Sequence, residues 1–406
     1  MKAKFLSALT ATLFSIILLN GCCCKAASQV KDSGTKFAAE AVKPYIESGE
    51  LPGIINVFCK GNIQEVTCAG WANVEKKLPI TLDNMFMQCS QTKGFCGVTV
   101  AILVEEGKIS LDDPVSKYLP EFANLKVAVK DAKGKKTVVP AKNAVTVRMV
   151  MNHTGGFNFE IPTKQKKGWP ALSLRETAKE AASVPLLFEP GTNSKYSNTG
   201  IDIGAAIVEV VSGKPWDVFL KERVFEPLGM TSSTFQPTDA QLEKSIQLYQ
   251  IVKGQKAQFK AFNRQMPLPH NGPTVHPSAG AGLWTTANDQ LKFYKMLMNL
   301  GVGENGVRIL KEETVKSILA TSTRPAGLGN YSMGLHVNFN KATMGHGGAW
   351  GTSCTVNWKA KELRLKVVQL NGQPRPWDAE IAKAANKFFA MKVDDSGTEA
   401  YTGRLK

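Results

Sequence analysis

The chain has 406 residues, of which 43% are hydrophobic and 21% charged, so it is long enough to bury a sizeable core. Its formal net charge of +16 at pH 7 would by itself allow a nucleic-acid-binding protein. The densest basic runs, 133–136 and 164–167, lie in loop-like stretches without interleaved aromatic side chains. We therefore interpret the charge as a solvated surface and expect no nucleic-acid partner.

The first 21 residues are typical of an export signal. Lys2 and Lys4 supply positive charge, and the apolar stretch 5–19 is too short for a membrane-spanning helix, which needs roughly 20 apolar residues. The sequence Leu-Asn-Gly-Cys that ends at Cys22 resembles a bacterial lipobox. This resemblance implies an exported protein of the bacterial periplasm or cell envelope that a lipid on Cys22 anchors to a membrane. Ordinary secretion with cleavage nearby is the alternative.

Beyond the three cysteines at the lipid site, the chain has five others, at positions 59, 68, 89, 96 and 354. An odd number in an oxidising compartment indicates at least one free thiol. If Gly61-Asn62 is the turn of a hairpin, Cys59 faces Gln64 and Cys68 lies roughly 13 Å away, beyond disulfide reach. We therefore expect buried thiols. The sequence has no CxxC or HExxH spacing, so we expect no metal site.

The first part of the chain predicts two helices and a hairpin. Residues 36–47 have the apolar spacing of an amphipathic helix, and 54–59 and 63–69 alternate like the strands of a hairpin. A second helix begins near Ser90 and continues to about Glu106. Helix signals dominate the middle of the chain, and the clearest cover 172–182, 200–211 and 216–225.

Strand patterns return late, and the last helix covers 378–390; the strands are 332–337, 349–358 and 363–370. Strands at both ends favour an α/β (α+β) fold, with one antiparallel sheet built from both chain ends, flanked by helices, and an inserted all-helical domain. A cleft between the two parts would be the natural site. The expected divisions are a signal at 1–21, a tether at 22–34, a sheet domain at 35–109 and 270–392, a helical domain at 110–269 and a tail at 393–406.

The segment Ser90-Gln91-Thr92-Lys93 has the spacing S-x-x-K. Residues three apart on a helix share a face, so the Lys93 amine can reach the Ser90 hydroxyl. A lysine removes a proton only when it is neutral, so burial must lower its pKa from about 10.4. The same spacing starts at Ser28 and Ser33 in the polar tether, where nothing could desolvate a lysine. A helix-capping serine with a surface lysine is the alternative.

Two further segments carry suitable chemistry. Tyr196-Ser197-Asn198 follows a Glu-Pro-Gly loop before a helix and is the one Y-x-N among seven tyrosines. A phenol near Ser90 can relay a proton, and an asparagine amide can hold a lysine and bind a substrate carbonyl. His346-Gly347-Gly348-Ala349 leads into the expected strand 349–358, where glycines let another backbone approach closely. A capped helix and an ordinary turn are the alternatives.

In this order, the three motifs resemble those of the serine β-lactamase and penicillin-binding protein superfamily, in particular its branch of class C β-lactamases, D-peptidases and esterases. The likeness extends beyond the three motifs, through 147–157, 188–235 and 279–293, and covers most of 35–390. It implies that Ser90 is the acylated nucleophile and that Lys93 and Tyr196 handle the proton. No cofactor is implied.

The resemblance also implies residues around the substrate. Asn198, His346, Gly347 and Gly348 would bind it, and the backbone amides of Ser90 and Ala349 would form the oxyanion hole. Lactam-hydrolysing relatives usually have lysine at the position of His346, whereas a histidine is mostly neutral at pH 7. We infer a weaker demand for an anionic substrate, which favours esters, D-amino-acid peptides or slow lactam turnover.

The expected function is therefore a serine hydrolase that forms an acyl-enzyme at Ser90 with a small amide or ester, namely a β-lactam, a D-amino-acid peptide or an ester. We expect a monomer that is attached to a membrane through its N-terminal lipid. One alternative is a protein of the same fold that binds or acylates penicillin or peptidoglycan peptides without efficient turnover. The other is a basic structural protein of the envelope, which would not react with serine-directed reagents.

Overall fold

The computed structural model describes residues 30–130, 134–162, 172–251, 259–261 and 276–391. The expected export signal, the lipidation site Cys22 and the tail 393–406 lie outside these residues. Within them, no helix has the length and apolar character needed to cross a bilayer.

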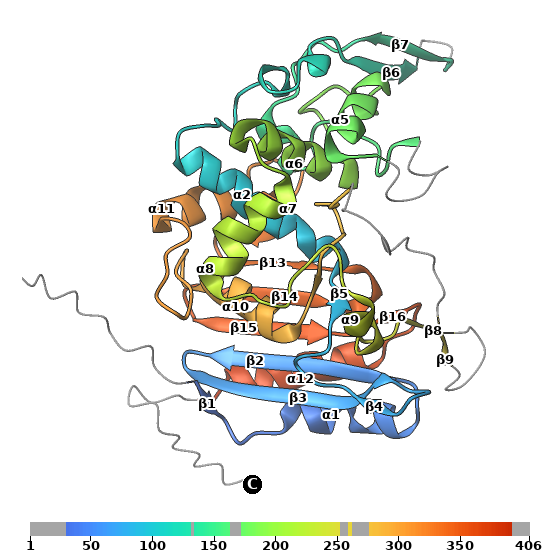
Figure 1. Cartoon of the computed structure of the whole chain (residues 1–406), viewed down its shortest axis with the longest axis vertical. Helices are drawn as coiled ribbons and strands as arrows, with labels where there is room; N and C mark the ends of the chain where they lie inside the picture. The colour runs from blue at the N-terminus through green and yellow to red at the C-terminus, as the bar shows by residue number, and fades with distance from the viewer. Residues whose placement is uncertain (1–29, 131–133, 163–171, 252–258, 262–275, 392–406) are drawn as a thin grey trace, which may run out of the picture.

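A nine-stranded sheet forms the centre of the fold and takes strands from both ends of the chain (Figure 1). Its order is β1-β3-β2-β15-β14-β13-β12-β11, with β4 paired to β3. All these pairs are antiparallel except β1 with β3. The prediction of a sheet completed by both chain ends is confirmed. The strands are β1 (Lys31–Asp32), β2 (Gly53–Lys60), β3 (Ile63–Asn73), β4 (Leu78–Pro79), β11 (Tyr331–Ser332), β12 (Leu335–Asn338), β13 (Thr343–Gly347), β14 (Ser353–Asn357) and β15 (Glu362–Val367).

Helices cover both faces of the sheet, as the burial of β2 on both sides shows. Ile54 and Phe58 pack in one apolar cluster, whereas Ile55, Val57 and Cys59 pack in the larger one. Successive side chains of a strand point to opposite faces, so this single strand contributes to both clusters. The covering helices are α1 (Phe37–Glu47) and α12 (Trp377–Phe389) on the first face, and α2 (Thr92–Glu105) and α10 (Ala287–Met298) on the second.

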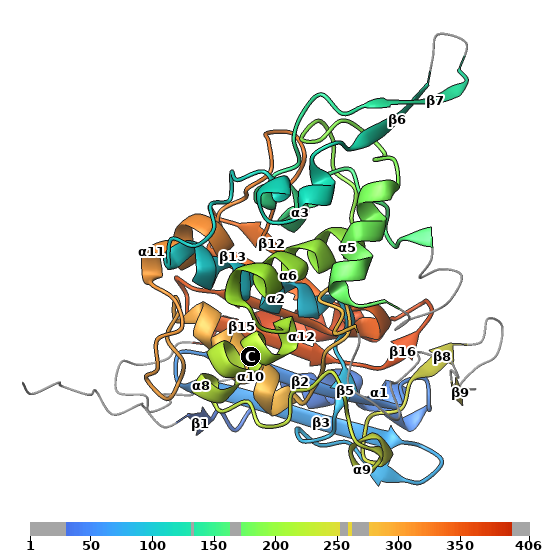
Figure 2. The same cartoon turned by 45° about the horizontal axis from the view of Figure 1, so that its top comes forward.

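The middle of the chain is mainly helical but contains strands that the sequence did not predict. The β6–β7 hairpin extends away from the rest of the molecule (Figure 1, Figure 2), and β8 pairs with β9 and with β16 near the sheet. The helices are α3 (Val147–Met151), α5 (Leu174–Ser183), α6 (Asn198–Ser212), α7 (Trp216–Leu220), α8 (Glu226–Leu228) and α9 (Asp239–Glu243). The strands are β6 (Lys126–Lys130), β7 (Lys136–Pro140), β8 (Tyr249–Ile251), β9 (Phe259–Ala261) and β16 (Leu370–Asn371).

The larger apolar cluster continues from the sheet into this middle region, where it includes Leu174 of α5 and Ile207 of α6. The two parts therefore share one core, and the domain division at 110 and 269 stays a proposal. The remaining elements are α11 (Glu312–Thr314) and the paired strands β5 (Phe86–Met87) and β10 (Trp284–Thr285).

Three sequence predictions need correction. The expected strand 332–337 is instead two strands, β11 and β12, because Met333 and Gly334 adopt positive φ angles of 46° and 76° and form a turn between them. The expected strand 349–358 begins only at Ser353, because Trp350 and Gly351 adopt positive φ angles of 66° and 98° and form a turn. Cys59 faces Gln64 as predicted, and the five cysteines of the described residues are free, but Cys68 is exposed rather than buried. Successive side chains of β3 point to opposite faces of the sheet, so Cys68 points away from the face on which its neighbour Thr67 is buried.

Glycines let α2 approach the turn between β11 and β12 closely. A Cβ added at Gly97 would lie 1.8 Å from the Met333 carbonyl oxygen, and one at Gly94 would lie 2.7 Å from Leu335. On the turn itself, Gly334 has a φ of +76°, and its Cβ would lie 2.2 Å from the Lys93 carbonyl oxygen. This backbone contact holds the first turns of α2, which carry the S-x-x-K motif, against the sheet.

We expect Gly97→Ala to lower the free energy of unfolding by about 3 kcal/mol, the upper end of the usual range for overpacking, because the added methyl group would meet backbone. Urea denaturation of the purified protein would measure the change. Gly347→Ala is the matched control, since its Cβ would come no closer than 3.6 Å to the Thr352 carbonyl oxygen. Equal denaturation midpoints for the two variants would show that the α2 contact is not tight.

Candidate active site

Ser90 lies in a short turn that joins β5 to α2. Cys89–Gln91 form a 3-10 turn, and the α-helix proper begins at Thr92. Cys89 has a φ of +53°, which is uncommon for a residue with a side chain. The Thr92 hydroxyl donates to the Cys89 carbonyl at 2.7 Å and accepts the Leu283 amide at 3.2 Å. These bonds hold the half-buried Ser90 side chain at the N-terminus of α2.

Lys93 is fully buried one turn beyond Ser90, and its Nζ lies 3.3 Å from the Ser90 Oγ. The amine also donates to Asn198 Oδ1 at 2.6 Å and to the Gly280 carbonyl at 2.5 Å. Burial lowers the pKa of Lys93 from its usual 10.5 to about 7, although the charges of Asp202 and Glu160 oppose this shift. A large fraction of the amine is therefore neutral at pH 7 and can accept the serine proton.

Tyr196 contacts both members of this pair. The Ser90 side chain is close enough to its hydroxyl to lower the pKa of the phenol, and the Lys93 Nζ lies 4.6 Å from the centroid of its ring. Burial raises the pKa of the Tyr196 phenol to about 12. The phenol thus stays protonated at neutral pH, where it can pass on a proton but seldom exists as a phenolate. Of the two groups, Lys93 is better suited to be the base.

Asn198 is the first residue of α6, and its amide links two charged groups. Its Oδ1 accepts from Lys93, while its Nδ2 donates to Glu160 Oε1 at 2.7 Å. The preceding residue, Ser197, caps the helix by accepting the Gly200 amide at 2.9 Å. The Y-x-N segment is therefore both a helix cap and part of the site, and one Nδ2 hydrogen already has an acceptor.

His346 lies on β13, and its ring is held inside the protein with only 6% of the residue exposed. Its Nε2 lies 3.1 Å from the Tyr331 hydroxyl, and its Nδ1 contacts the Gly347 carbonyl. Burial and the charge of Lys93 hold the pKa of His346 well below its usual 6.5. The ring is close to the site, 6.1 Å from that of Tyr196 between centroids, and is neutral.

The glycines after His346 bring β13 against the serine turn. A Cβ on Gly348 would lie 2.3 Å from the Gln88 carbonyl oxygen, so this position must lack a side chain. The Gly348 amide donates to the Thr352 carbonyl at 2.8 Å, and the exposed Ala349 follows. This contact brings Ala349 to the segment that precedes Ser90, as an oxyanion hole from their two amides would require.

Sequence reasoning missed the polar groups behind Lys93. The Gly280 amide donates to Asp202 Oδ1 at 3.1 Å, and a Cβ on Gly280 would lie 2.7 Å from that of Asn198. Asp202 is fully buried and also accepts from Ser278 Oγ at 3.2 Å. Its Oδ2 lies 3.3 Å from His276 Nε2. An acid within the otherwise apolar run 200–208 was a usable signal, because buried carboxylates need partners.

His153 was also missed as a neighbour of the site. Its ring lies 4.6 Å from that of Tyr196 and 4.6 Å from that of Tyr331, between centroids. Its Nδ1 accepts the Ser197 amide at 3.4 Å, and its φ is +68°. Burial keeps the pKa of His153 well below 6.5, so it supports the Tyr196 ring as a neutral group.

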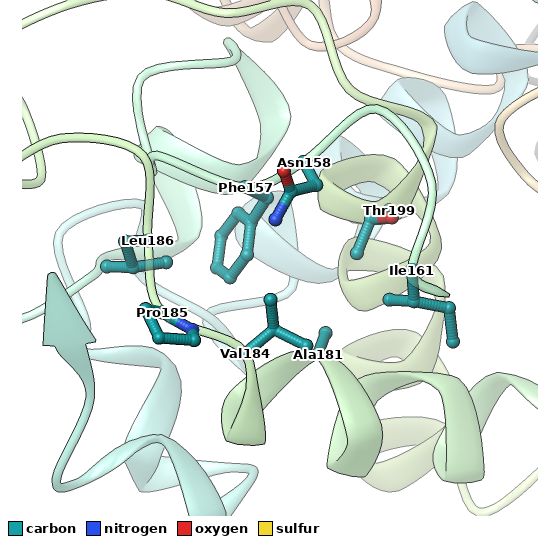
Figure 3. A pocket seen from close by; sticks show the side chains of 8 residues that line it. All are labelled: Phe157, Asn158, Ile161, Ala181, Val184, Pro185, Leu186 and Thr199. Carbon is teal, nitrogen blue, oxygen red and sulfur yellow. The ribbon is translucent and has the colours of Figure 1, made fainter. Parts of the chain in front are cut away.

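A small, mostly apolar cavity lies between the segment 157–161 and the C-terminal end of α5 (Figure 3). Its lining residues are Phe157, Asn158, Ile161, Ala181, Val184, Pro185, Leu186 and Thr199. The side chains around Ser90 do not line it, so it is separate from the catalytic groups. In the described part of the chain, no three His, Cys, Asp or Glu side chains are grouped as a metal site would require.

Comparison with known proteins gives a consistent result. The β-lactamase family model matches residues 38–387. A putative D-alanyl-D-alanine carboxypeptidase of Escherichia coli K12 is 25% identical over 353 residues, which are 78% of this chain and 75% of that protein. Esterase EstB of Burkholderia gladioli is 27% identical over 267 residues, 60% of this chain and 64% of that protein.

Among solved structures, simvastatin synthase LovD from Aspergillus terreus has the same fold. It superposes with a TM-score of 0.72 at 16% identity, covering 87% of this chain and 97% of that one. The family match spans most of the chain and includes all three motifs. The chain therefore belongs to the β-lactamase family and is a serine hydrolase of that family.

Proposed function

We propose that the protein hydrolyses an ester or a D-amino-acid amide through an acyl-enzyme at Ser90. One observation carries the proposal: a buried lysine with a pKa of about 7 lies 3.3 Å from the Ser90 oxygen. The Tyr196 phenol is a neighbour of the same serine and of Lys93, so the hydroxyl has both a base and a proton relay beside it.

The proposed reaction has two stages. Neutral Lys93 accepts the Ser90 proton as Oγ attacks the substrate carbonyl carbon, and the amides of Ser90 and Ala349 bind the resulting oxyanion. When the tetrahedral intermediate collapses, the bond to the leaving group breaks, and this group takes a proton from Lys93 through the Tyr196 hydroxyl. In the second stage, a water molecule attacks the acyl carbonyl carbon and gives a proton to the same pair. The bond between this carbon and Ser90 Oγ then breaks, Oγ takes the proton back from the pair, and the acid leaves.

The surroundings of His346 support a substrate without a carboxylate, such as an ester or an uncharged D-amino-acid amide, over a lactam that carries one. The imidazole is buried, neutral and bonded to Tyr331, so it supplies no positive charge for a substrate carboxylate. The name of one relative, an esterase, fits the first of these classes. Export, lipid attachment at Cys22, membrane anchoring and a monomeric state are further proposals from the sequence.

We expect steady turnover of a p-nitrophenyl ester at a rate at least tenfold above that of a chromogenic cephalosporin, with a D-alanyl-D-alanine peptide as the third substrate. Absorbance assays at matched concentrations would measure the first two rates, and released D-alanine the third. Faster cephalosporin turnover would refute the substrate preference. A burst of one product per protein without further release would instead indicate a binding protein, and the absence of both product and fluorophosphonate labelling would refute the hydrolase.

A further inference from the structure

Two carboxylates are linked to the Lys93 amine by hydrogen bonds, each through one intervening residue. The amine donates to two neutral oxygens, Asn198 Oδ1 at 2.6 Å and the Gly280 carbonyl at 2.5 Å. Each of these residues donates in turn to an acid. Asn198 Nδ2 bonds to Glu160 at 2.7 Å, and the Gly280 amide bonds to Asp202 at 3.1 Å.

We propose that Glu160 and Asp202 are positioning residues that hold the two amide oxygens on Lys93 and set the pH range in which this lysine acts as a base. The inference rests on the proposed function, because it concerns the base that activates Ser90. Neither carboxylate belongs to the three motifs, and neither needs to touch the substrate.

The hydrogen bonds of the two carboxylates fix the orientation of both amide groups. An ionised carboxylate only accepts hydrogen bonds, so Glu160 must face the NH₂ end of the Asn198 amide, and the oxygen end is then turned to Lys93. Asp202 binds both Ser278 and the Gly280 amide, so it fixes the backbone whose carbonyl accepts from Lys93. A glutamine at 160 could present either a donor or an acceptor, and the Asn198 amide would lose its fixed orientation.

The charges of the two carboxylates also act on the pKa of Lys93. Burial lowers the pKa of Lys93, whereas Asp202 and Glu160 raise it, and Cys89 and Cys96 act in the same direction as the acids. The neutral rings of Tyr196, His153 and His346 also lie close to Lys93, and His276 Nε2 lies 3.3 Å from Asp202 Oδ2. A direct ion pair would keep the amine charged, and burial alone would leave it a weaker base. Because Coulomb energy falls with distance, a carboxylate beyond one intervening residue attracts the charged amine less than a direct ion pair would, but more than burial without any carboxylate.

The test is the pH dependence of ester turnover in Glu160→Gln. The wild-type kcat/KM should fall tenfold per pH unit below about 7, where Lys93 becomes protonated. The decline of kcat/KM at low pH is called the acidic limb of the pH profile. Loss of the Glu160 charge lowers the pKa of Lys93, so the acidic limb of the variant should lie about one pH unit lower than that of the wild-type protein. We also expect its maximal kcat/KM to fall about tenfold as the Asn198 orientation is lost. Asp202→Asn should move the limb in the same direction.

Two further variants separate charge from structure. Glu160→Asp keeps the charge, so its limb should stay at the wild-type pH even if its rate falls. Glu47→Gln removes an exposed acid on α1, whose pair with Lys43 lies at the surface, and should leave both limb and rate unchanged. Circular dichroism would verify that each variant is folded.

The outcomes distinguish this inference from the proposed function. Wild-type turnover with a limb near pH 7, together with unmoved limbs in Glu160→Gln and Asp202→Asn, would overturn the inference and leave the hydrolase standing. A wild-type protein without ester turnover or serine labelling would overturn both. A limb that also moves in Glu160→Asp would show that packing rather than charge is responsible, and would overturn the role proposed here.

Discussion

Ser90→Ala is expected to abolish labelling by a serine-reactive fluorophosphonate and to remove ester turnover above the uncatalysed rate. No other hydroxyl can take over readily, because the Lys93 amine and the Tyr196 phenol both face this oxygen. The substitution removes one atom from a half-buried turn, so the thermal midpoint should change little. Gel fluorescence would measure the loss of labelling, and absorbance of released p-nitrophenol would measure the loss of ester turnover.

The chain offers a matched control in Ser33, which starts another S-x-x-K spacing. Its hydroxyl bonds to Thr35, and the lysine of that spacing, Lys36, is exposed, so no desolvated base is available. Ser33→Ala should keep full labelling. Labelling that survives in Ser90→Ala, or that disappears in Ser33→Ala, would mean that the nucleophile has been wrongly assigned.

Lys93→Ala is expected to slow acylation by about 10²–10⁴-fold, the usual contribution of a general base. Its effect should also depend on pH. In the wild-type protein, acylation falls below pH 7 as the amine, with its pKa of about 7, becomes protonated and can no longer accept the serine proton. Without this amine, the limb near pH 7 should disappear. Stopped-flow measurement of p-nitrophenol release from pH 5 to 9 would record both effects.

Lys36→Ala removes the exposed lysine of the second S-x-x-K spacing and should leave the acylation rate and its pH profile as in the wild-type protein. If Lys93→Ala acylates at the wild-type rate, lysine has no part in the mechanism. If it is slow but keeps a decline below pH 7, a group other than Lys93 controls that titration.

Local sequence patterns predicted the regular elements well and the irregular ones poorly. The hairpin register that pairs Cys59 with Gln64 follows from a two-residue turn and strand alternation, both of which are short-range properties. The β6–β7 hairpin was missed because each of its strands has only five residues, most of them exposed, and lacks the apolar pattern of a buried sheet. The turn at Trp350 was read as strand, since a positive φ there depends on contacts with distant segments.

The sequence by itself determined which groups can react. Residues three apart on one helix must share a face, so Ser90 and Lys93 could be paired without knowing the rest of the fold. Their distance of 3.3 Å agrees with this rule. The ordered motifs likewise indicated that Tyr196 and Asn198 belong with them, and the family match is consistent with that order.

Only the tertiary structure decided how these groups are tuned. The pKa of Lys93 falls to about 7 because α6 and the segment around Gly280, both more than 100 residues away in the chain, exclude water from its amine. The neutrality of His346 has the same cause. Desolvation depends on everything packed around a charge, and the position of Glu160 behind Asn198 has no short-range pattern that could have predicted it.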